Sequence, residues 1–338
     1  MKNFFTQFLK SCFFLSLGVF IIWWFQRGLT IEEKTEIGQS FQNANYYLIG
    51  LVLVFGIISH VFRTLRWQLL LEPIGKTPAF LNTFLSVMVG YFANLAIPRL
   101  GEVVRCTILH KYEKIPVEKS LGTVVTERLM DILLFLILFI LAFLIEYDAL
   151  KVYVSNTFSM GYSNNILALK NLIFFLVAVI ILFSIAYVLY RHYKEKLSKS
   201  LFFGKVVKIL QGFAKGLLSI KKIKHPGLFV LYSILIWVCY WIMIYLGLQS
   251  VREIGDITPS IALVALEMGT IGVMITPGGI GLYPVIISES LSIFGISKTL
   301  GYAGGWLSWG SQTLMIIVAG LISMLLLPII NKNKFSKE

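Results

Sequence analysis

The sequence has few of the residues that bind metals or form disulfide bonds. It contains 3 cysteines and 4 histidines in 338 residues. The cysteines lie far apart, in or beside apolar runs, at Cys12, Cys106 and Cys239. Neither they nor the histidines have the spacing of a metal site. There is also no GxxxxGK[ST] nucleotide loop. We therefore expect no disulfide framework, no metal site and no cofactor.

Charged residues are also scarce. They make up 14% of the chain against 57% hydrophobic residues, and the mean hydropathy is +0.81. Soluble domains are about 25% charged, so this composition excludes them and indicates an all-α polytopic membrane protein. The net charge of +13 comes from lysines and arginines between apolar runs. The positive-inside rule and anionic lipid head groups explain that pattern, so we expect no nucleic acid partner.

The apolar runs predict six full spans and two helix pairs that are each interrupted by a break. A signal peptide is the rival interpretation of the first run, but that run is long and has no small-residue cleavage site, which favours a retained helix. The predicted spans are residues 8–26, 46–65, 123–145, 166–190, 227–249 and 300–330. The predicted pairs are 79–97 with 102–112, and 260–276 with 285–296.

The first break carries charges that do not suit a lipid environment. Arg99, Glu102 and Arg105 fall within seven residues, and each charge facing lipid would cost about 2.5–3.5 kcal/mol. Pro98 suits the first turn of a new helix, so we expect one helix to end near Ile97 and another to start at Pro98. The free N–H groups of that start, beside Arg99, would bind an anion. The alternative is a cytoplasmic loop whose arginines only obey the positive-inside rule.

The second break repeats the first. Sliding the sequence on itself by 179 positions places Pro98 on Pro277, in the segment TPGGIGLYP, and VEKSLG (117–122) on ISKTLG (296–301). These matches fall on the two breaks and on the starts of the spans that follow them. We therefore expect a single domain (1–338) with two repeats, at 46–145 and 227–330.

The distribution of basic residues predicts the topology. Lysine and arginine are concentrated at both ends and in 63–76, 99–119 and 191–224, and they are sparse in 27–45, 146–165 and 250–259. Eight full crossings would place two basic segments outside, whereas six spans plus two re-entrant hairpins keep every basic segment inside. The hairpins then enter from opposite faces, which makes the repeats inverted, as in many transporters. We expect a protein of the cell membrane with both termini in the cytoplasm.

Residues 191–225 differ from the rest of the chain. Ten lysines and arginines alternate there with apolar residues at helical spacing. This pattern predicts a basic amphipathic helix on the cytoplasmic membrane surface, in contact with anionic lipid. It serves either as a topology anchor or as a regulatory surface.

Three motifs in order resemble a known family. They are N-x-x-x-P-R-L-G-E-x-x-R (94–105), T-E-R-L-M-D (126–131) and P-G-G-I-G (277–281). They are similar to the lysylphosphatidylglycerol synthase transmembrane-region family of flippase-like membrane domains, over essentially the whole chain. The resemblance implies a lipid-handling domain whose characteristic polar residues are Pro98, Arg99, Gly101, Glu102, Arg105, Glu127, Arg128 and Asp131.

The sequence also departs from that family. The chain ends at Glu338, so we expect no soluble synthase domain and no aminoacyl transfer. Where the family has a glutamate after PGGIG and an arginine in the last span, this sequence has Pro284 and the uncharged stretch 306–310. Glu267 and Glu289 either replace those charges in part or are structural carboxylates.

We expect a flippase or scramblase that moves a phospholipid or polyprenyl-linked amphiphile with an anionic or zwitterionic head group. Transport would be passive or coupled to an ion. The predicted head-group site is Pro98, Arg99, Gly101, Arg105, Gly278, Gly279 and Gly281. The predicted buried charge network, which serves either transport or structure, is Glu102, Glu127, Arg128 and Asp131. Two of its three acids, Glu127 and Asp131, share one helix face.

Two other functions remain open. An intramembrane transferase on lipid-linked substrates would use Glu102 or Asp131 as a general base, but the chain has no nucleophile motif or donor-binding domain, so we assign no catalytic residue. A membrane partner or regulator without transport activity would dock through residues 200–224.

Overall fold

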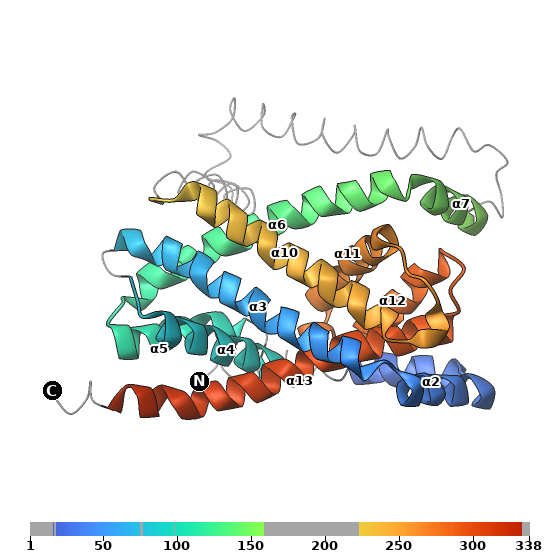
Figure 1. Cartoon of the computed structure of the whole chain (residues 1–338), viewed down its shortest axis with the longest axis horizontal. Helices are drawn as coiled ribbons and strands as arrows, with labels where there is room; N and C mark the ends of the chain where they lie inside the picture. The colour runs from blue at the N-terminus through green and yellow to red at the C-terminus, as the bar shows by residue number, and fades with distance from the viewer. Residues whose placement is uncertain (1–15, 17, 75–76, 98, 159–222, 333–338) are drawn as a thin grey trace, which may run out of the picture.

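The computed structural model describes residues 16, 18–74, 77–97, 99–158 and 223–332, and these are helical with short connections. The helix over 18–28 precedes the elements named in Figure 1. The α-helices are α2 (Ile31–Asn43), α3 (Tyr46–Leu71), α4 (Phe80–Ala96), α5 (Leu100–Glu113), α6 (Val117–Ile145), α7 (Tyr147–Phe158), α10 (Pro226–Gln249), α11 (Pro259–Ile275), α12 (Leu282–Ser292) and α13 (Lys298–Ile330). Short 3₁₀ turns are η1 (Glu72–Ile74), η3 (Arg252–Ile254) and η4 (Pro277–Gly279).

Four of these helices are long and apolar enough to cross a membrane, namely α3, α6, α10 and α13. The shortest, α10, has 24 residues and therefore spans about 36 Å, more than the roughly 30 Å of a hydrocarbon core. This confirms the predicted all-α membrane class. The span predicted at 166–190 lies outside the described residues. So do most of the basic helix at 191–225 and the start of the first span.

The helices α3 and α10 are antiparallel neighbours. The N–H of Asn45, just before α3, donates to the carbonyl of Ser250, just after α10, at 2.7 Å. At the other end, Lys224 contacts Glu72 at 2.7 Å. Figure 1 shows the two helices side by side along the long axis of the molecule. The two helices are therefore packed together over most of their length.

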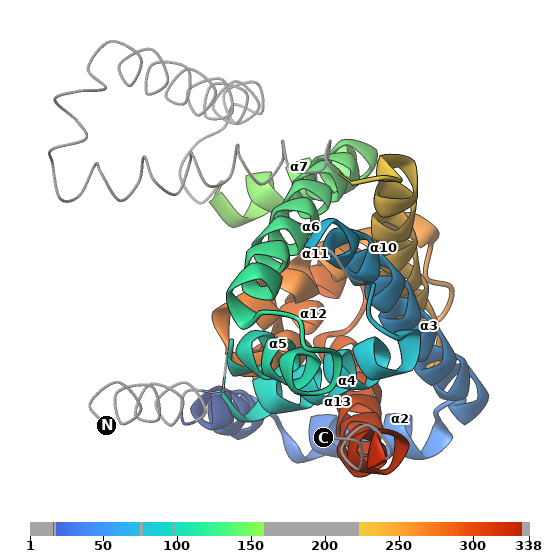
Figure 2. The same ribbon diagram turned by 90° about the vertical axis from the view of Figure 1, so that its left-hand side faces the viewer.

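The short helices occupy opposite halves of the molecule. Figure 1 shows α4 and α5 in its left half and α11 and α12 in its right half. The pair α4 and α5 packs on α13, through α4, while α11 packs on α6. Figure 2, which looks along the long axis, shows the four long helices partly surrounding these short ones. The two short pairs are thus held inside a frame of spanning helices.

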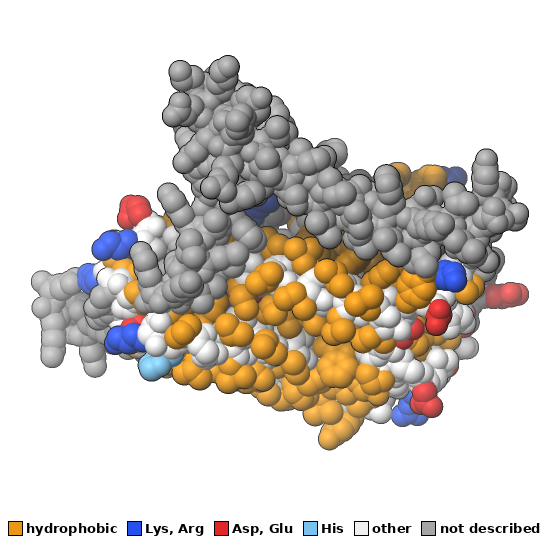
Figure 3. All heavy atoms as spheres, turned by 90° about the horizontal axis from the view of Figure 1, so that it is seen from above, with side chains coloured by type: hydrophobic (Ala, Val, Ile, Leu, Met, Phe, Trp, Pro, Cys, Tyr) orange, Lys and Arg blue, Asp and Glu red, His pale blue; other side chains and the backbone are white. Residues whose placement is uncertain are grey.

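The outer surface matches a lipid environment. Large apolar side chains are exposed along α6 and α13, for example Leu144 at 65% and Leu325 at 69%. Figure 3 shows apolar side chains over the middle of the visible face and charged ones at its two ends. An exposed apolar surface of this kind is rare in soluble proteins and is expected where lipid covers it.

Several helices extend beyond their predicted bounds. The helix α3 does not stop near residue 65 but continues to Leu71, and α6 begins at Val117 instead of 123. Arg63 and Arg66 are therefore buried inside α3, with 5% and 0% of their surface exposed, and do not lie in a loop. Because both guanidinium groups are paired with carboxylates, the two arginines can be buried within the helix. Segment 63–76 consequently holds fewer free cations than the topology argument assumed.

The polar segment 27–45 contains a helix that the apolar pattern did not predict. The hydroxyl of Thr30 accepts from the N–H of Glu33 at 3.2 Å, and the Glu33 carboxylate accepts from the N–H of Thr30 at 2.7 Å. This reciprocal capping box starts α2, which packs beside α13. The T-x-x-E spacing was readable in the sequence.

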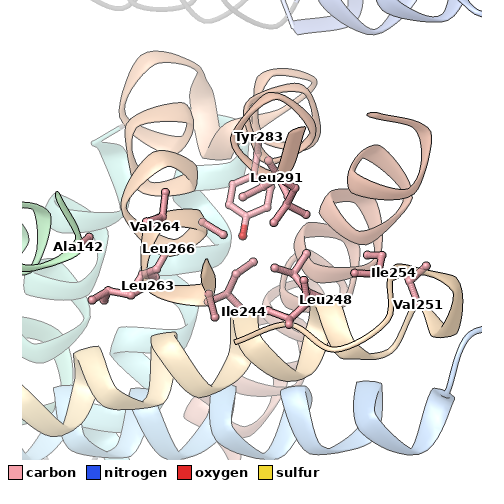
Figure 4. Close-up of a cluster of buried hydrophobic side chains, with 14 of the residues drawn as sticks. Ala142, Ile244, Leu248, Val251, Ile254, Leu263, Val264, Leu266, Tyr283 and Leu291 are labelled. Carbon is pink, nitrogen blue, oxygen red and sulfur yellow. The ribbon is translucent and has the colours of Figure 1, made fainter. Parts of the chain in front are cut away.

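The largest apolar cluster joins the second pair of short helices to α10. Its buried members come mainly from α10, η3, α11 and α12, with Ala142 from α6. Figure 4 shows the ring of Tyr283 pointing from α12 into the cluster, toward Ile244 and Leu248 of α10. This packing fixes α11 and α12 against α10.

Candidate functional site: two helix breaks and a buried charge network

The break between α4 and α5 is a tight backbone turn. Ile97 is extended, and Arg99 adopts the left-handed conformation with φ 68° before α5 begins at Leu100. The two helices touch where Gly90 faces Gly101, and a Cβ on Gly101 would overlap the Gly90 carbonyl. Only glycine allows this approach. Pro98 itself lies outside the described residues.

The predicted anion site at this helix start is partly occupied by the protein. The N–H of Gly101 donates to the side-chain oxygen of Asn94 at 2.8 Å, so Asn94 caps one of the free donors. Arg99 is exposed and forms no ion pair within the described part of the chain. Its guanidinium is therefore available at the surface, whereas the Gly101 N–H is not.

A buried charge network joins α3 to α6. Asp131 contacts Arg66 at 2.6 Å and Arg63 at 3.2 Å, and Arg66 also contacts Glu127 at 3.4 Å. Arg66 and Glu127 are 0% and 1% exposed at the side chain. Arg63 also donates to the Tyr240 hydroxyl of α10 at 2.8 Å. Unpaired charges at this depth would be expensive, so these contacts are what permit their burial.

The helix α5 joins the same network through Arg105. Its guanidinium pairs with the Glu127 carboxylate and lies over the ring of Trp67, 4.2 Å from the centroid. The Trp67 indole N–H donates to the Thr123 hydroxyl at 2.9 Å, which fixes the ring. Arg105 is thus held between an anion and an aromatic face, the pair of partners that guanidinium groups favour.

The outer edge of the network is more exposed. Arg128 contacts Glu102 of α5 at 2.7 Å and Asp131 at 4.0 Å, with the Arg128 and Glu102 side chains 44% and 25% exposed. The structure thus brings together the four predicted network residues and adds Arg63, Arg66 and Arg105. Four arginines and three carboxylates, all ionised, leave the network with a net charge of +1.

A small pocket lies between the first helix pair and this outer edge. It is lined by Val87, Gly90, Tyr91, Asn94, Gly101, Glu102, Arg105 and Arg128. Its volume of about 10 Å³ is roughly that of one water molecule. Polar side chains line it, and it is too small for a molecule much larger than water.

The second break has a different chemistry. Gly278, Gly279 and Gly281 all have positive φ, at 62°, 80° and 74°. The indole of Trp309 donates to the Gly278 carbonyl at 2.6 Å, so the turn is tied to α13. The predicted site residues of this break, Gly278, Gly279 and Gly281, have no charged side chains and do not belong to the charge network.

The two breaks approach one another. A Cβ built on Gly278 would lie 3.5 Å from the side chain of Leu95, at the end of α4, and η4 packs against α4. The helix over 18–28 also reaches the second break, since a Cβ on Gly281 would overlap the Gly18 carbonyl. The tips of both helix pairs therefore meet inside the frame of long helices.

The two carboxylates of the second half differ in their surroundings. Glu289 is half-exposed and pairs with Lys298 at 2.7 Å. Glu267 of α11 is 1% exposed, and neither of its carboxylate oxygens has a hydrogen-bond partner within the described residues. No group of three or more metal-binding side chains occurs in that part of the chain either.

Comparison with known proteins identifies the family. Residues 11–325 match the lysylphosphatidylglycerol synthase TM region. The chain belongs to this family. The resemblance of the three motifs is thereby confirmed. Over 307 residues the chain is also 28% identical to UPF0104 membrane protein MJ1595 of Methanocaldococcus jannaschii, covering 84% of this chain and 86% of that protein. No solved structure matches it.

The chain is thus a multi-pass integral membrane protein of the lysylphosphatidylglycerol synthase TM family, with apolar spans that agree with that assignment. Sequence reasoning missed Arg63 and Arg66, because arginines near the end of an apolar run are typical of a cytoplasmic boundary. One signal was present: the run resumes after Arg66 as WQLLL, so the arginines interrupt an apolar segment instead of ending it. Asn94 was part of the motif, but its capping role required the structure.

Proposed function

We propose that this protein moves an amphiphile with an anionic or zwitterionic head group, a phospholipid or a polyprenyl-linked lipid, between the leaflets of the cell membrane. The observation that carries this is the meeting of two broken-helix tips inside a frame of spanning helices, beside a buried network of arginines and carboxylates. Non-helical backbone survives at membrane depth where it is buried in protein or lines a wet cavity. Family membership supports a lipid-related role.

An inverted repeat underlies this proposal. Moving the bounds of α4 by 179 positions gives 259–275, the bounds of α11, and moving those of α3 gives 225–250, close to α10. The contacts follow the same rule, because α4 packs on α13 as α11 packs on α6. Since α3 and α10 are antiparallel, the two repeats have opposite orientations. Transporters with this plan bind substrate where the repeats meet.

In this scheme α4 with α5, and α11 with α12, are re-entrant hairpins. The helix α5 has 14 residues and covers about 21 Å, too short for a full crossing. Figure 1 shows the two pairs in opposite halves, as expected if they enter from opposite faces. Both termini then lie in the cytoplasm, together with the basic segment 191–224.

The head group would bind at the first hairpin. Arg99 is the exposed first contact, and Arg128 and Glu102 form the partly exposed pair that closes the pocket above Arg105. An anionic phosphate attracts Arg128 away from Glu102 and so opens the pocket. The acyl or prenyl chains remain in lipid at a lateral opening. Arg63 and Arg66 hold α3 to α6 and take no part in binding.

Leaflet exchange in proteoliposomes tests the proposal. The assay follows fluorescent phospholipids of anionic and zwitterionic type, and a polyprenyl phosphate lipid, in vesicles with wild-type protein, Arg99→Ala or Arg252→Ala. Arg252 is also exposed but lies in η3, after α10 and outside both helix breaks, which makes it a matched control. We expect fast exchange by wild type and Arg252→Ala.

For Arg99→Ala we expect a loss of about 10- to 100-fold, the value of one charged hydrogen bond at about 1.5–3 kcal/mol. Absence of exchange by wild type for all three lipid types would refute the transport proposal. Equal loss in both arginine variants would refute the site.

A further inference from the structure

Glu267 is a buried acid beside the largest apolar cluster. It lies in the middle of α11, and its residue is 1% exposed. Neither carboxylate oxygen has a hydrogen-bond partner within the described residues. Its neighbours in sequence, Ala265 and Leu266, belong to the largest apolar cluster. A charge buried without a partner is so costly that a carboxyl group takes up a proton instead.

Among the described residues, no charged side chain pairs with Glu267. The elements packed on α11 are α6, α10, α12 and η4. The helix α10 has no acidic or basic side chain, and its titratable groups are Tyr232, Cys239, Tyr240 and Tyr245. Tyr283 of α12 is a buried member of the cluster. Figure 4 shows the Tyr283 ring inside that cluster. The charges of α6 are Glu118 and Lys119 at its exposed start and three members of the charge network. The one acid of α12 is paired with Lys298, and η4 has no titratable group.

The proposed repeat shows that packing does not require an acid there. The same shift of 179 positions that superposes the two halves brings Glu267 onto Met88 of α4, which is fully buried. An apolar side chain therefore fills the equivalent place in the first half. A carboxyl group at this position costs stability and adds no contact, which indicates a role in function.

We propose that Glu267 is a proton-binding site that couples lipid movement to proton movement; this rests on the proposed transport function. In the closed form the carboxyl carries a proton and is neutral in its apolar surroundings. When the second hairpin moves, the side chain meets water, and the proton passes from the carboxyl oxygen to a water molecule on that face. The resulting carboxylate cannot return to the apolar cluster until it takes a proton from water again.

This mechanism assigns a different task to each half. The first hairpin holds the arginines that attract the head group, and the second holds a single acid that limits its own return. Gly278 and Gly279 of η4 have positive φ, and in this scheme the turn that they form is the joint about which α11 moves. Because Glu267 is the one buried acid of the second hairpin, this hairpin moves one proton per cycle.

Protonation is measured first, without transport. Infrared difference spectra of the purified full-length protein in lipid are compared for wild type, Glu267→Gln and Glu289→Gln. Glu289 is a matched control because it lies on the neighbouring helix but is half-exposed and paired with Lys298. We expect the band of a protonated carboxyl in wild type and Glu289→Gln and its loss in Glu267→Gln. Persistence of the band in Glu267→Gln would overturn the proposal.

Coupling is measured in the same preparations. Leaflet exchange is followed in proteoliposomes with a pH difference across the membrane. For wild type and Glu289→Gln we expect the exchange rate to change about tenfold per pH unit, the limit for one proton bound per cycle. For Glu267→Gln and Glu267→Met, the residue of the first half, we expect a rate independent of pH.

The outcomes separate the two proposals. A wild-type rate that does not respond to the pH difference would overturn the coupling and leave the transport proposal intact. Absence of lipid exchange at every pH, with the carboxyl band present, would overturn the transport proposal and support Glu267 as a proton-binding site.

Discussion

Glu127 should be the residue whose neutralisation costs this fold most. It is the shared partner of Arg66 and Arg105 and is 1% exposed at the side chain. With four arginines and three carboxylates the network has a charge of +1; Glu127→Gln raises it to +2, whereas Arg105→Met lowers it to zero. The two substitutions remove the same contact but have opposite effects on the balance.

The magnitudes follow from what each change leaves behind. Glu127→Gln leaves the buried Arg105 without its carboxylate partner and Arg66 with Asp131 alone, which costs about 3–5 kcal/mol. Arg105→Met leaves Glu127 paired with Arg66 and removes one charged hydrogen bond, at about 1.5–3 kcal/mol. As a control, Lys298→Met breaks the surface pair with Glu289 and should cost at most about 1 kcal/mol.

Equilibrium unfolding of the three variants in mixed micelles measures these differences. The expected order of destabilisation is Glu127→Gln, then Arg105→Met, then Lys298→Met. A larger loss of stability for Arg105→Met than for Glu127→Gln would refute the reasoning from net charge. Equal losses of stability for the buried variants and for Lys298→Met would refute the claim that burial determines how much an ion pair contributes to stability.

Two further predictions concern the helix breaks. Gly101→Ala should destabilise the protein by at least about 1–3 kcal/mol in the same unfolding assay, because the new Cβ meets the backbone of α4. The control Gly122→Ala, in open space, should stabilise it by about 0.5–1 kcal/mol. Equal effects of the two substitutions would argue against the close contact between α4 and α5. Trp309→Phe removes the hydrogen bond to the Gly278 carbonyl and should cost about 1 kcal/mol. The rate of amide hydrogen exchange should then rise in η4 and α12 but not in α5. An unchanged exchange rate in η4 would argue that the Trp309 hydrogen bond does not hold this turn.

Much of this architecture was predictable from local signals. Proline, glycine and a change of hydropathy mark both breaks, and the four-residue spacing of Glu127 and Asp131 places them on one helix face. The all-α membrane class followed from composition. These features depend on residues close in the sequence, which is why a pattern shows them.

The rest depends on contacts between distant residues. Arg66 meets Asp131 across 65 positions, so its burial could not be distinguished from a cytoplasmic boundary without the fold. Asn94 was visible in the motif, but its bond to the Gly101 N–H forms only when α4 and α5 fold back on each other. The isolation of Glu267 is likewise a property of the packed cluster and not of its own helix.

Tying the two hairpin tips together tests the account most directly. Leu95→Cys and Gly278→Cys put a thiol on each tip, where the side chains would be neighbours, in a chain whose 3 native cysteines are replaced by alanine. Leaflet exchange is then measured before linking, after reaction with a short cleavable bifunctional thiol reagent, and after cleavage. The account predicts fast exchange before linking, no exchange in the linked protein, and fast exchange again after cleavage. Exchange that continues at the same rate in the linked protein would contradict it.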